Sequence, residues 1–176
     1  MGTSAVMTFQ QFEKLPDDDL RHELLQGQHM VSLPDTIRRS NIRHAIHDVL
    51  RPYVREHRLG EVLITAGFLL SNDSFLLPAA SFIRTAHLQR TDPDGCLEGA
   101  PAVAVEVASE SNTAAQLDRK MEQYFEHGSE EVWIIYPETR KIRIHFSNGS
   151  SRTAATELTS NVFPGWPAPL TSVFAD

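Results

Sequence analysis

The chain has 176 residues, of which 41% are hydrophobic, and it carries a formal net charge of -7 and one cysteine. This length suits one domain over residues 1–176. The sequence shows neither a secretion signal nor the roughly 18 consecutive apolar residues of a membrane span, so we expect a cytoplasmic protein. Because Cys96 is the only cysteine, an internal disulfide and a four-cysteine zinc site are excluded. The negative net charge gives the protein no general electrostatic attraction to nucleic acid.

The first third of the chain predicts two helices separated by a hairpin. A short helix should end at Pro16, and two short strands should follow over residues 21–33, with Gly27 in the turn. Apolar residues at helical spacing over 36–57 predict the longest helix, which Pro52 should bend or shorten. This helix also carries a set of basic residues, which we interpret as a solvated face: Arg38, Arg39, Arg43, His44, Arg51, Arg55, His57 and Arg58.

The centre of the chain predicts a sheet with a crossover helix. Residues 61–70 and 75–83 are strand-like runs joined by the turn sequence SNDS, and we expect them to pair antiparallel. The apolar run 102–109, a helix over 112–127 and the apolar run 131–137 together predict a βαβ unit.

The remaining segments complete the predicted fold class. Gly128 stands where a glycine commonly ends a helix, residues 141–149 predict a further strand, and 153–158 predict another. The prediction is an α/β or α+β fold with a mixed sheet, one helix before the sheet and one after its central strand.

Glu106 does not fit a plain core strand. It stands inside the apolar run 102–109, whose other members are almost all small or β-branched apolar residues. An ionised carboxylate there costs several kcal/mol unless it is paired, protonated or bound to a cation, so we expect a partner. The alternative is a carboxylate at the exposed end of the strand that pairs with an arginine.

Lys120 and Glu23 are the other two unusual residues. Lys120 lies three residues after Leu117 and four before Tyr124, so it falls on or beside the apolar stripe of its helix. Its amine could point toward the sheet, or it could extend along the apolar edge into water. Glu23 begins a short apolar strand, and taken alone it is interpreted as a surface residue paired with Arg21.

Taken together, these residues resemble the PD-(D/E)XK nuclease superfamily, in its Uma branch of restriction-endonuclease-like nucleases. The likeness begins with residues 7–27, MTFQQFEKLPDDDLRHELLQG, and ends with residues 163–174, FPGWPAPLTSVF. Its most specific part is segment 101–137, where an acidic residue in an apolar strand, two serines, a helical lysine followed by a tyrosine, a glycine and EVWII occur in the family's order. The resemblance implies a restriction-endonuclease-like core with flanking helices.

The resemblance also implies a metal-dependent catalytic site for phosphodiester hydrolysis. Its matching residues are Glu23, Glu106 and Lys120. Glu23 and Glu106 would be the ligands of Mg²⁺, a cation that prefers oxygen ligands, and Lys120 would orient the attacking water or neutralise charge on the phosphate. DNA as a partner and a homodimeric state are further implications.

The sequence departs from the family pattern at one metal-binding position. The aspartate that follows the strand proline is replaced by Ala79, whose methyl group cannot coordinate a cation. The lysine that many members carry in the central strand is also replaced, by Ala108, so the amine must come from the helix, as is usual in the Uma branch. We therefore expect a nuclease-like protein with impaired catalysis.

Three alternatives remain open at this stage. A relocated carboxylate, Asp73 or Glu61, could replace the lost aspartate if the strand register brings it to the site. The chain could instead be a non-catalytic nucleic-acid or protein interaction module of the same fold. In the third alternative, Glu106 and Lys120 form an internal ion pair with no further role.

Overall fold

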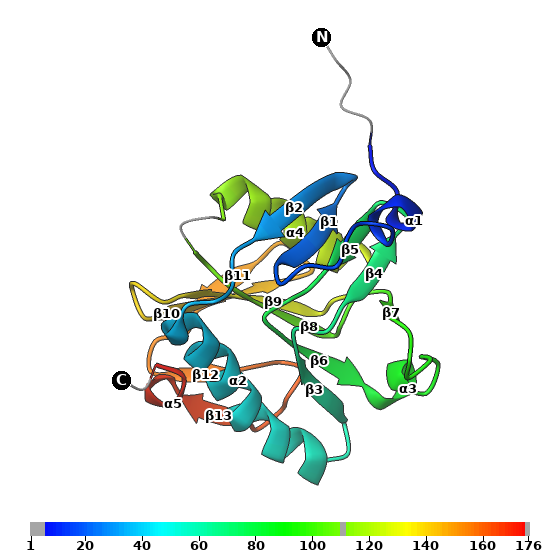
Figure 1. Ribbon diagram of the computed structural model, residues 1–176. Helices are drawn as coiled ribbons and strands as arrows, with labels where there is room; N and C mark the ends of the chain where they lie inside the picture. The colour runs from blue at the N-terminus through cyan, green and yellow to red at the C-terminus, as the bar shows by residue number, and fades with distance from the viewer. Residues whose placement is uncertain (1–5, 110–111, 175–176) are drawn as a thin grey trace.

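The computed structural model describes residues 6–109 and 112–174, and their strands form three sheets (Figure 1). The five-stranded sheet contains β1 (Arg21–Leu25), β2 (Gln28–Ser32), β4 (Phe68–Ser71), β5 (Ser74–Leu76) and β7 (Leu97–Glu98), in the order β2-β1-β5-β4-β7. The six-stranded sheet contains β3 (Gly60–Ile64), β6 (Ala80–Arg84), β8 (Val103–Val107), β9 (Glu131–Tyr136), β10 (Lys141–Phe146) and β11 (Ser151–Thr153), in the order β11-β10-β9-β8-β6-β3. The third sheet pairs β12 (Glu157–Thr159) with β13 (Pro167–Pro169).

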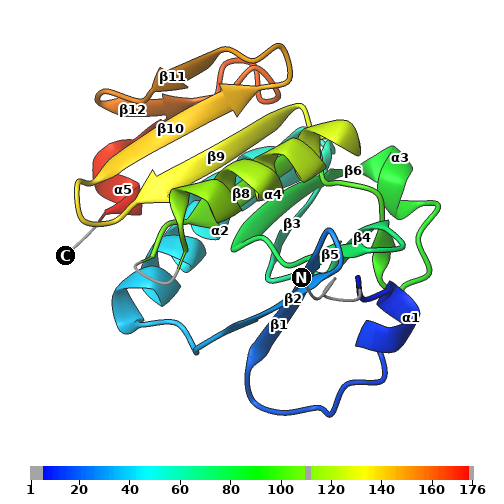
Figure 2. The ribbon, with the colours of Figure 1, turned by 90° about the horizontal axis from the view of Figure 1, so that it is seen from above.

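The helices cover the six-stranded sheet on both faces (Figure 2). Helix α2 packs on one face, and helix α4 lies on the other, where the five-stranded sheet also packs. In the described part of the chain, no helix has the length and apolar character needed to cross a bilayer. The helices are α1 (Phe9–Phe12), α2 (Ile37–Glu56), α3 (Thr85–Leu88), α4 (Ala114–Glu126) and α5 (Leu170–Val173).

Helix α2 follows the predicted apolar periodicity. Its fully buried residues are spaced four apart, so that they form one stripe against the sheet. Pro52 does not end the helix, which continues to Glu56, so the expected shortening is wrong. The buried stripe consists of Ile42, Ile46, Leu50 and Val54.

The predicted βαβ unit is present. Strands β8 and β9 are parallel neighbours and pair Glu106 with Ile134, while α4 connects them. Thr113 and Gln116 form a capping box at the start of α4, and Gly128 follows its end with a φ of 109°. That φ favours glycine because side chains with a Cβ rarely adopt it, which explains why the helix stops there.

The two runs predicted as one hairpin each divide into two strands. The first run breaks at Thr65, which has a φ of 55°, and the second breaks around Pro78. The antiparallel pairing was predicted correctly, but β4 pairs with β5 in the five-stranded sheet, whereas β3 pairs with β6 in the six-stranded sheet. The chain therefore crosses between the sheets at Pro78 and Ala79, where a proline cannot donate a ladder hydrogen bond.

Four short elements were not predicted and one was misplaced. Helix α3 and strand β7 lie between the predicted runs 75–83 and 102–109, and strand β13 and helix α5 lie near the end of the chain. The predicted strand over 153–158 overlaps β11 by one residue at its start and β12 by two at its end. Such short strands depend on their sheet neighbours more than on local residue preference.

Candidate active site

Lys120 is at the centre of the buried face of α4. Leu117, Lys120 and Tyr124 are buried at intervals of three and four residues, and only 1% of the Lys120 side chain is exposed. The alternative in which the amine extends into water is therefore wrong. Because the amine points toward the sheets, it must find partners inside the protein.

The partners of Lys120 are the two predicted carboxylates. Its Nζ donates to both oxygens of Glu23 at 2.8 Å and to Oε1 of Glu106 at 3.3 Å. Glu23 comes from β1 of the five-stranded sheet and Glu106 comes from β8 of the six-stranded sheet. The structure thus brings the three predicted site residues together, and we call this group the Lys120 cluster.

Glu106 points toward α4 because of its place in the strand pattern. Val103, Val105 and Val107 belong to the core on the α2 side, so the alternate residue Glu106 faces the opposite side. It is buried, and its Oε1 also accepts a hydrogen bond from the Tyr124 hydroxyl at 2.8 Å. The alternative of an exposed strand end paired with an arginine is therefore wrong.

Glu23 has two further partners besides Lys120. The backbone N–H of Leu77 donates to its Oε1 at 2.8 Å, and Arg21 lies 3.6 Å from the same oxygen. The predicted pairing with Arg21 is confirmed, but Glu23 is buried rather than on the surface. The hydrogen bond to Leu77 places the carboxylate just before the point where the chain crosses between the sheets.

The charges of the site balance internally. Two carboxylates, Glu23 and Glu106, face two cations, Lys120 and Arg21. Burial alone would raise the pKa of Glu23, but Lys120 and Arg21 outweigh it, so the pKa is lowered. Burial would lower the pKa of Arg21, but Glu23 and Glu106 outweigh it and raise the pKa.

Tyr124 is a further member of the site, for which no catalytic or binding role was predicted from its place on the apolar stripe and in the family motif. Burial and the charge of Glu106 raise its pKa well above the ordinary value, so the hydroxyl stays protonated and donates to Glu106. Its position four residues after Lys120 was the available signal, because side chains at this spacing lie on the same helix face.

The pKa of Glu23 predicts an acid-sensitive stability. Since the folded state lowers this pKa below its ordinary value of 4.5, the unfolded chain binds the proton more tightly, and the free energy of unfolding should decrease as pH falls below about 5. Glu23→Gln should be less stable than the parent at neutral pH and should lose less stability on acidification. Urea unfolding between about pH 7 and about pH 3 measures both slopes.

The matched control for this prediction is Glu138→Gln, which removes a carboxylate with 82% of its side chain exposed. This variant should keep the pH dependence of the parent protein. Equal slopes for Glu23→Gln and the parent would contradict the assigned role of Glu23.

Ala79 lies beside the cluster but offers it no oxygen from its side chain. Its N–H donates to the carbonyl of Val105, the residue before Glu106, at 2.8 Å. Its methyl group belongs to the apolar core on the α2 side of the six-stranded sheet. Ser81, the next polar residue along β6, is buried, and its hydroxyl has no hydrogen-bond partner within the described ranges.

The residues present do not fit a Mg²⁺ ion. Over residues 6–109 and 112–174, no three His, Cys, Asp or Glu side chains lie close enough to hold a metal together. Asp73 instead accepts hydrogen bonds from Ser71 and Ser74 in the β4–β5 turn, so it does not replace the lost aspartate. The two carboxylates of the cluster already share the Lys120 ammonium.

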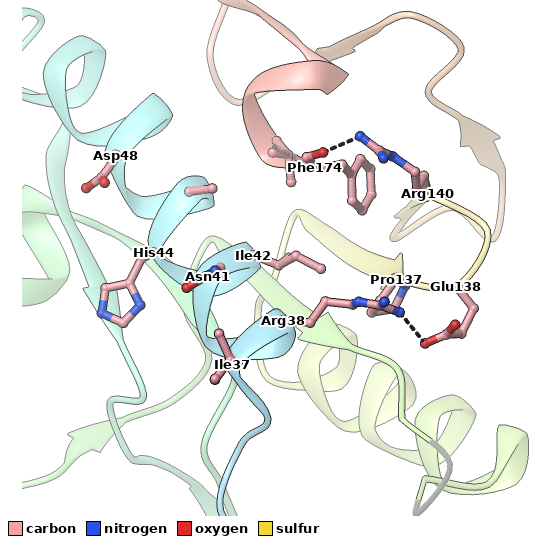
Figure 3. Close-up of a pocket in the computed structure, with 12 residues that line it drawn as sticks. Ile37, Arg38, Asn41, Ile42, His44, Asp48, Pro137, Glu138, Arg140 and Phe174 are labelled. Carbon is pink, nitrogen blue, oxygen red and sulfur yellow. Dashed lines mark hydrogen bonds and ion pairs between the residues drawn. The ribbon is translucent and has the colours of Figure 1, made fainter. Parts of the chain in front are cut away.

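A cavity of about 790 Å³ is separate from this cluster. It lies between α2, the turn after β9 and the end of α5 (Figure 3). Arg38 and Glu138 form an ion pair at 3.1 Å at its edge, and Arg140 donates to the carbonyl of Phe174. No residue of the Lys120 cluster lines this cavity, so the cavity does not give access to the cluster.

Comparison with known proteins identifies the family and the fold of the chain. The family model Uma2, described as "Putative restriction endonuclease", matches residues 9–171. The chain belongs to this family. The Uma2 match confirms the resemblance predicted from segment 101–137 and the restriction-endonuclease-like fold.

A solved structure shows the same fold as this Uma2 protein. It is described as a "putative nuclease belonging to DUF820" from Anabaena variabilis, with a TM-score of 0.83 and 15% identity, over 96% of this chain and 98% of that chain. No curated protein matches the chain. Family and fold together support a nuclease-like function.

Proposed function

We propose that this Uma2 protein is a restriction-endonuclease-like protein whose metal-dependent phosphodiester hydrolysis is impaired. The observation that carries the proposal is the position of the Lys120 ammonium, which donates to both Glu23 and Glu106. The absence of a carboxylate at Ala79 supports it. DNA is the substrate class that the family and the fold favour.

The internal contacts of the Lys120 cluster explain why phosphodiester hydrolysis is impaired. A hydrolytic site needs a cation or donor that stabilises the charge developing on the phosphate oxygens in the transition state. In this chain the amine of Lys120 is 1% exposed and its protons already bond to carboxylates. Lys120 therefore holds the carboxylates together and does not reach a phosphate.

The charges near α2 also reduce the attraction to DNA. Arg39 and Arg43 both pair with Asp35, at 3.3 Å and 2.8 Å, and Arg38 pairs with Glu138. An arginine that is neutralised inside the chain contributes less to phosphate binding than a free one. This pairing weakens the electrostatic part of DNA binding and supports slow or absent turnover.

A nicking assay on supercoiled DNA tests the proposal. With Mg²⁺ or Mn²⁺ present, the unmodified protein should cleave no faster than Glu106→Gln, since neither has a complete metal-binding site. The exposed Glu138→Gln variant is the control for changes in net charge. Metal-dependent cleavage by the unmodified protein that disappears in Glu106→Gln would overturn the proposal.

A further inference from the structure

We infer that Arg39 and Arg43 form a phosphate-binding site for the DNA backbone, and that Asp35 occupies this site in the unmodified chain. The inference rests on the proposed function, from which it takes DNA as the substrate class. It adds where the backbone binds and which side chain blocks that binding. Its support comes from the contacts, the exposure and the charges around Asp35.

A single carboxylate bridges the two arginines. Arg39 and Arg43 lie four residues apart on α2, so their side chains extend from the same face of the helix. Nη1 of Arg39 is 3.3 Å from Oδ1 of Asp35, and Nη1 of Arg43 is 2.8 Å from Oδ2. Guanidinium groups bind carboxylates and phosphates through the same paired oxygens, so a phosphodiester can take the place of this carboxylate. We call these three residues the Asp35 site.

The arginines keep donors that Asp35 does not satisfy. The Nε atoms of Arg39 and Arg43 are buried and have no hydrogen-bond partner in the part of the chain that the structure describes. Nη1 of Arg43 also donates to the Thr65 hydroxyl at 3.0 Å. A carboxylate has only two oxygens, whereas a phosphate group has four. A phosphate therefore matches the number of donors better than Asp35 does.

The Asp35 site is partly open to solvent, in contrast to the Lys120 cluster. The side chains of Arg39, Arg43 and Asp35 are 20%, 15% and 16% exposed, whereas that of Lys120 is 1% exposed. Asp35 lies in the segment between β2 and α2, outside both elements. A DNA backbone on the surface could therefore reach both guanidinium groups once the Asp35 side chain turns away.

The charges around the Asp35 site favour an anion. Arg21 links this site to the Lys120 cluster. Burial would lower its pKa, but Glu23 and Glu106 outweigh burial, and Asp35 adds to the rise. Together the two groups contain four cations and three carboxylates, so one positive charge remains for a phosphate backbone. The cations are Arg21, Arg39, Arg43 and Lys120, and the carboxylates are Glu23, Asp35 and Glu106.

DNA binding in EDTA tests the inference on three proteins. These are the unmodified chain, Asp35→Asn and the control Glu138→Gln, which changes the net charge equally and releases the exposed Arg38 of the same helix. Asp35→Asn should bind a short duplex about tenfold more tightly at about 50 mM salt, because two arginines become available to phosphates. Its log Kd should also depend more steeply on log salt, by about 1 to 2, since each phosphate contact contributes about 0.9. Glu138→Gln should stay within about twofold of the unmodified chain.

Two further variants assign the gain to the Asp35 site. Arg43→Gln combined with Asp35→Asn should lose most of the gain, because one of the two guanidinium groups is removed. Asp35→Glu keeps the carboxylate and should bind DNA as weakly as the unmodified chain. If Asp35→Asn is unfolded at low salt, the duplex should restore its folded tryptophan fluorescence, whereas sodium chloride of equal ionic strength should not.

Inorganic phosphate distinguishes the two sources of the ligand. Calorimetry with phosphate ions measures whether the released arginines bind a free anion. If Asp35→Asn binds phosphate but binds DNA no more tightly than Glu138→Gln does, the choice of the DNA backbone is wrong.

Three other results would overturn the inference. They are equal DNA affinities of Asp35→Asn and Glu138→Gln, a gain that survives the added Arg43→Gln, and an unfolded Asp35→Asn that the duplex does not restore. Each can be told apart from failure of the proposed function, because binding is measured in EDTA, where no metal-dependent cleavage takes place. Metal-dependent nicking by the unmodified protein contradicts only the proposed function.

Discussion

Ala79→Asp is expected to convert this protein into a magnesium-dependent nicking enzyme. The substitution restores the carboxylate that the family resemblance places with Glu23 and Glu106, while the resident cations remain Lys120 and Arg21. The cluster would then carry a net negative charge, which a divalent cation can neutralise. A metal contributes several kcal/mol of transition-state stabilisation, so we expect nicking to rise on the order of a thousandfold over the unmodified chain.

The position of residue 79 supports this expected gain. Its backbone N–H is bonded to the carbonyl of Val105, the residue before Glu106, so the backbone of residue 79 lies next to β8. Ala79 is only 5% exposed, so an aspartate there should destabilise the protein in EDTA. Mg²⁺ should restore the melting temperature, since the cation compensates the buried charge.

Ala79→Asn is the matched control, because it has almost the same shape as aspartate but no charge. It should neither bind Mg²⁺ nor cleave DNA. A stable Ala79→Asp protein that binds Mg²⁺ but does not nick DNA would show that Ala79 is not the sole cause of the impairment. The assay is single-strand nicking of supercoiled DNA over a range of Mg²⁺ concentrations.

Lys120→Met is expected to cost about 3–5 kcal/mol of unfolding free energy when no metal is present. The substitution keeps an unbranched side chain only one atom shorter but removes the charge that two buried carboxylates share. It also removes the link that joins α4 to β1 of the five-stranded sheet and to β8 of the six-stranded sheet. Urea unfolding in EDTA measures the loss, and the control Lys141→Met, which changes an exposed lysine, should stay within about 0.5 kcal/mol of the parent.

A double variant separates lost charge compensation from lost packing. Glu106→Gln combined with Lys120→Met leaves one carboxylate, Glu23, which keeps Arg21 as its cation. This variant should recover most of the stability that Lys120→Met loses, because no carboxylate remains without a cation. Failure to recover would mean that Lys120 stabilises the fold chiefly through the packing of its aliphatic chain.

Much of the site could be recognised from sequence patterns because those patterns are local. Helical spacing placed Lys120 on the stripe that begins at Leu117, and the apolar run around Glu106 predicted a buried carboxylate with a partner. The βαβ unit that positions both residues follows from the same periodicity. The catalytic roles of Glu23, Glu106 and Lys120 stay predictions until the variants are assayed.

Most helices and strands, the family likeness and the loss of the aspartate at Ala79 could be predicted from the residue pattern alone. The meeting of Glu23 on β1 with Lys120 on α4, and the hydrogen bond from Tyr124 to Glu106, emerged only in the folded chain. So did the division of each predicted hairpin strand between the two sheets. The reason is that side-chain periodicity is encoded within a few residues, whereas strand register and the meeting of distant charges depend on pairings far apart in the chain.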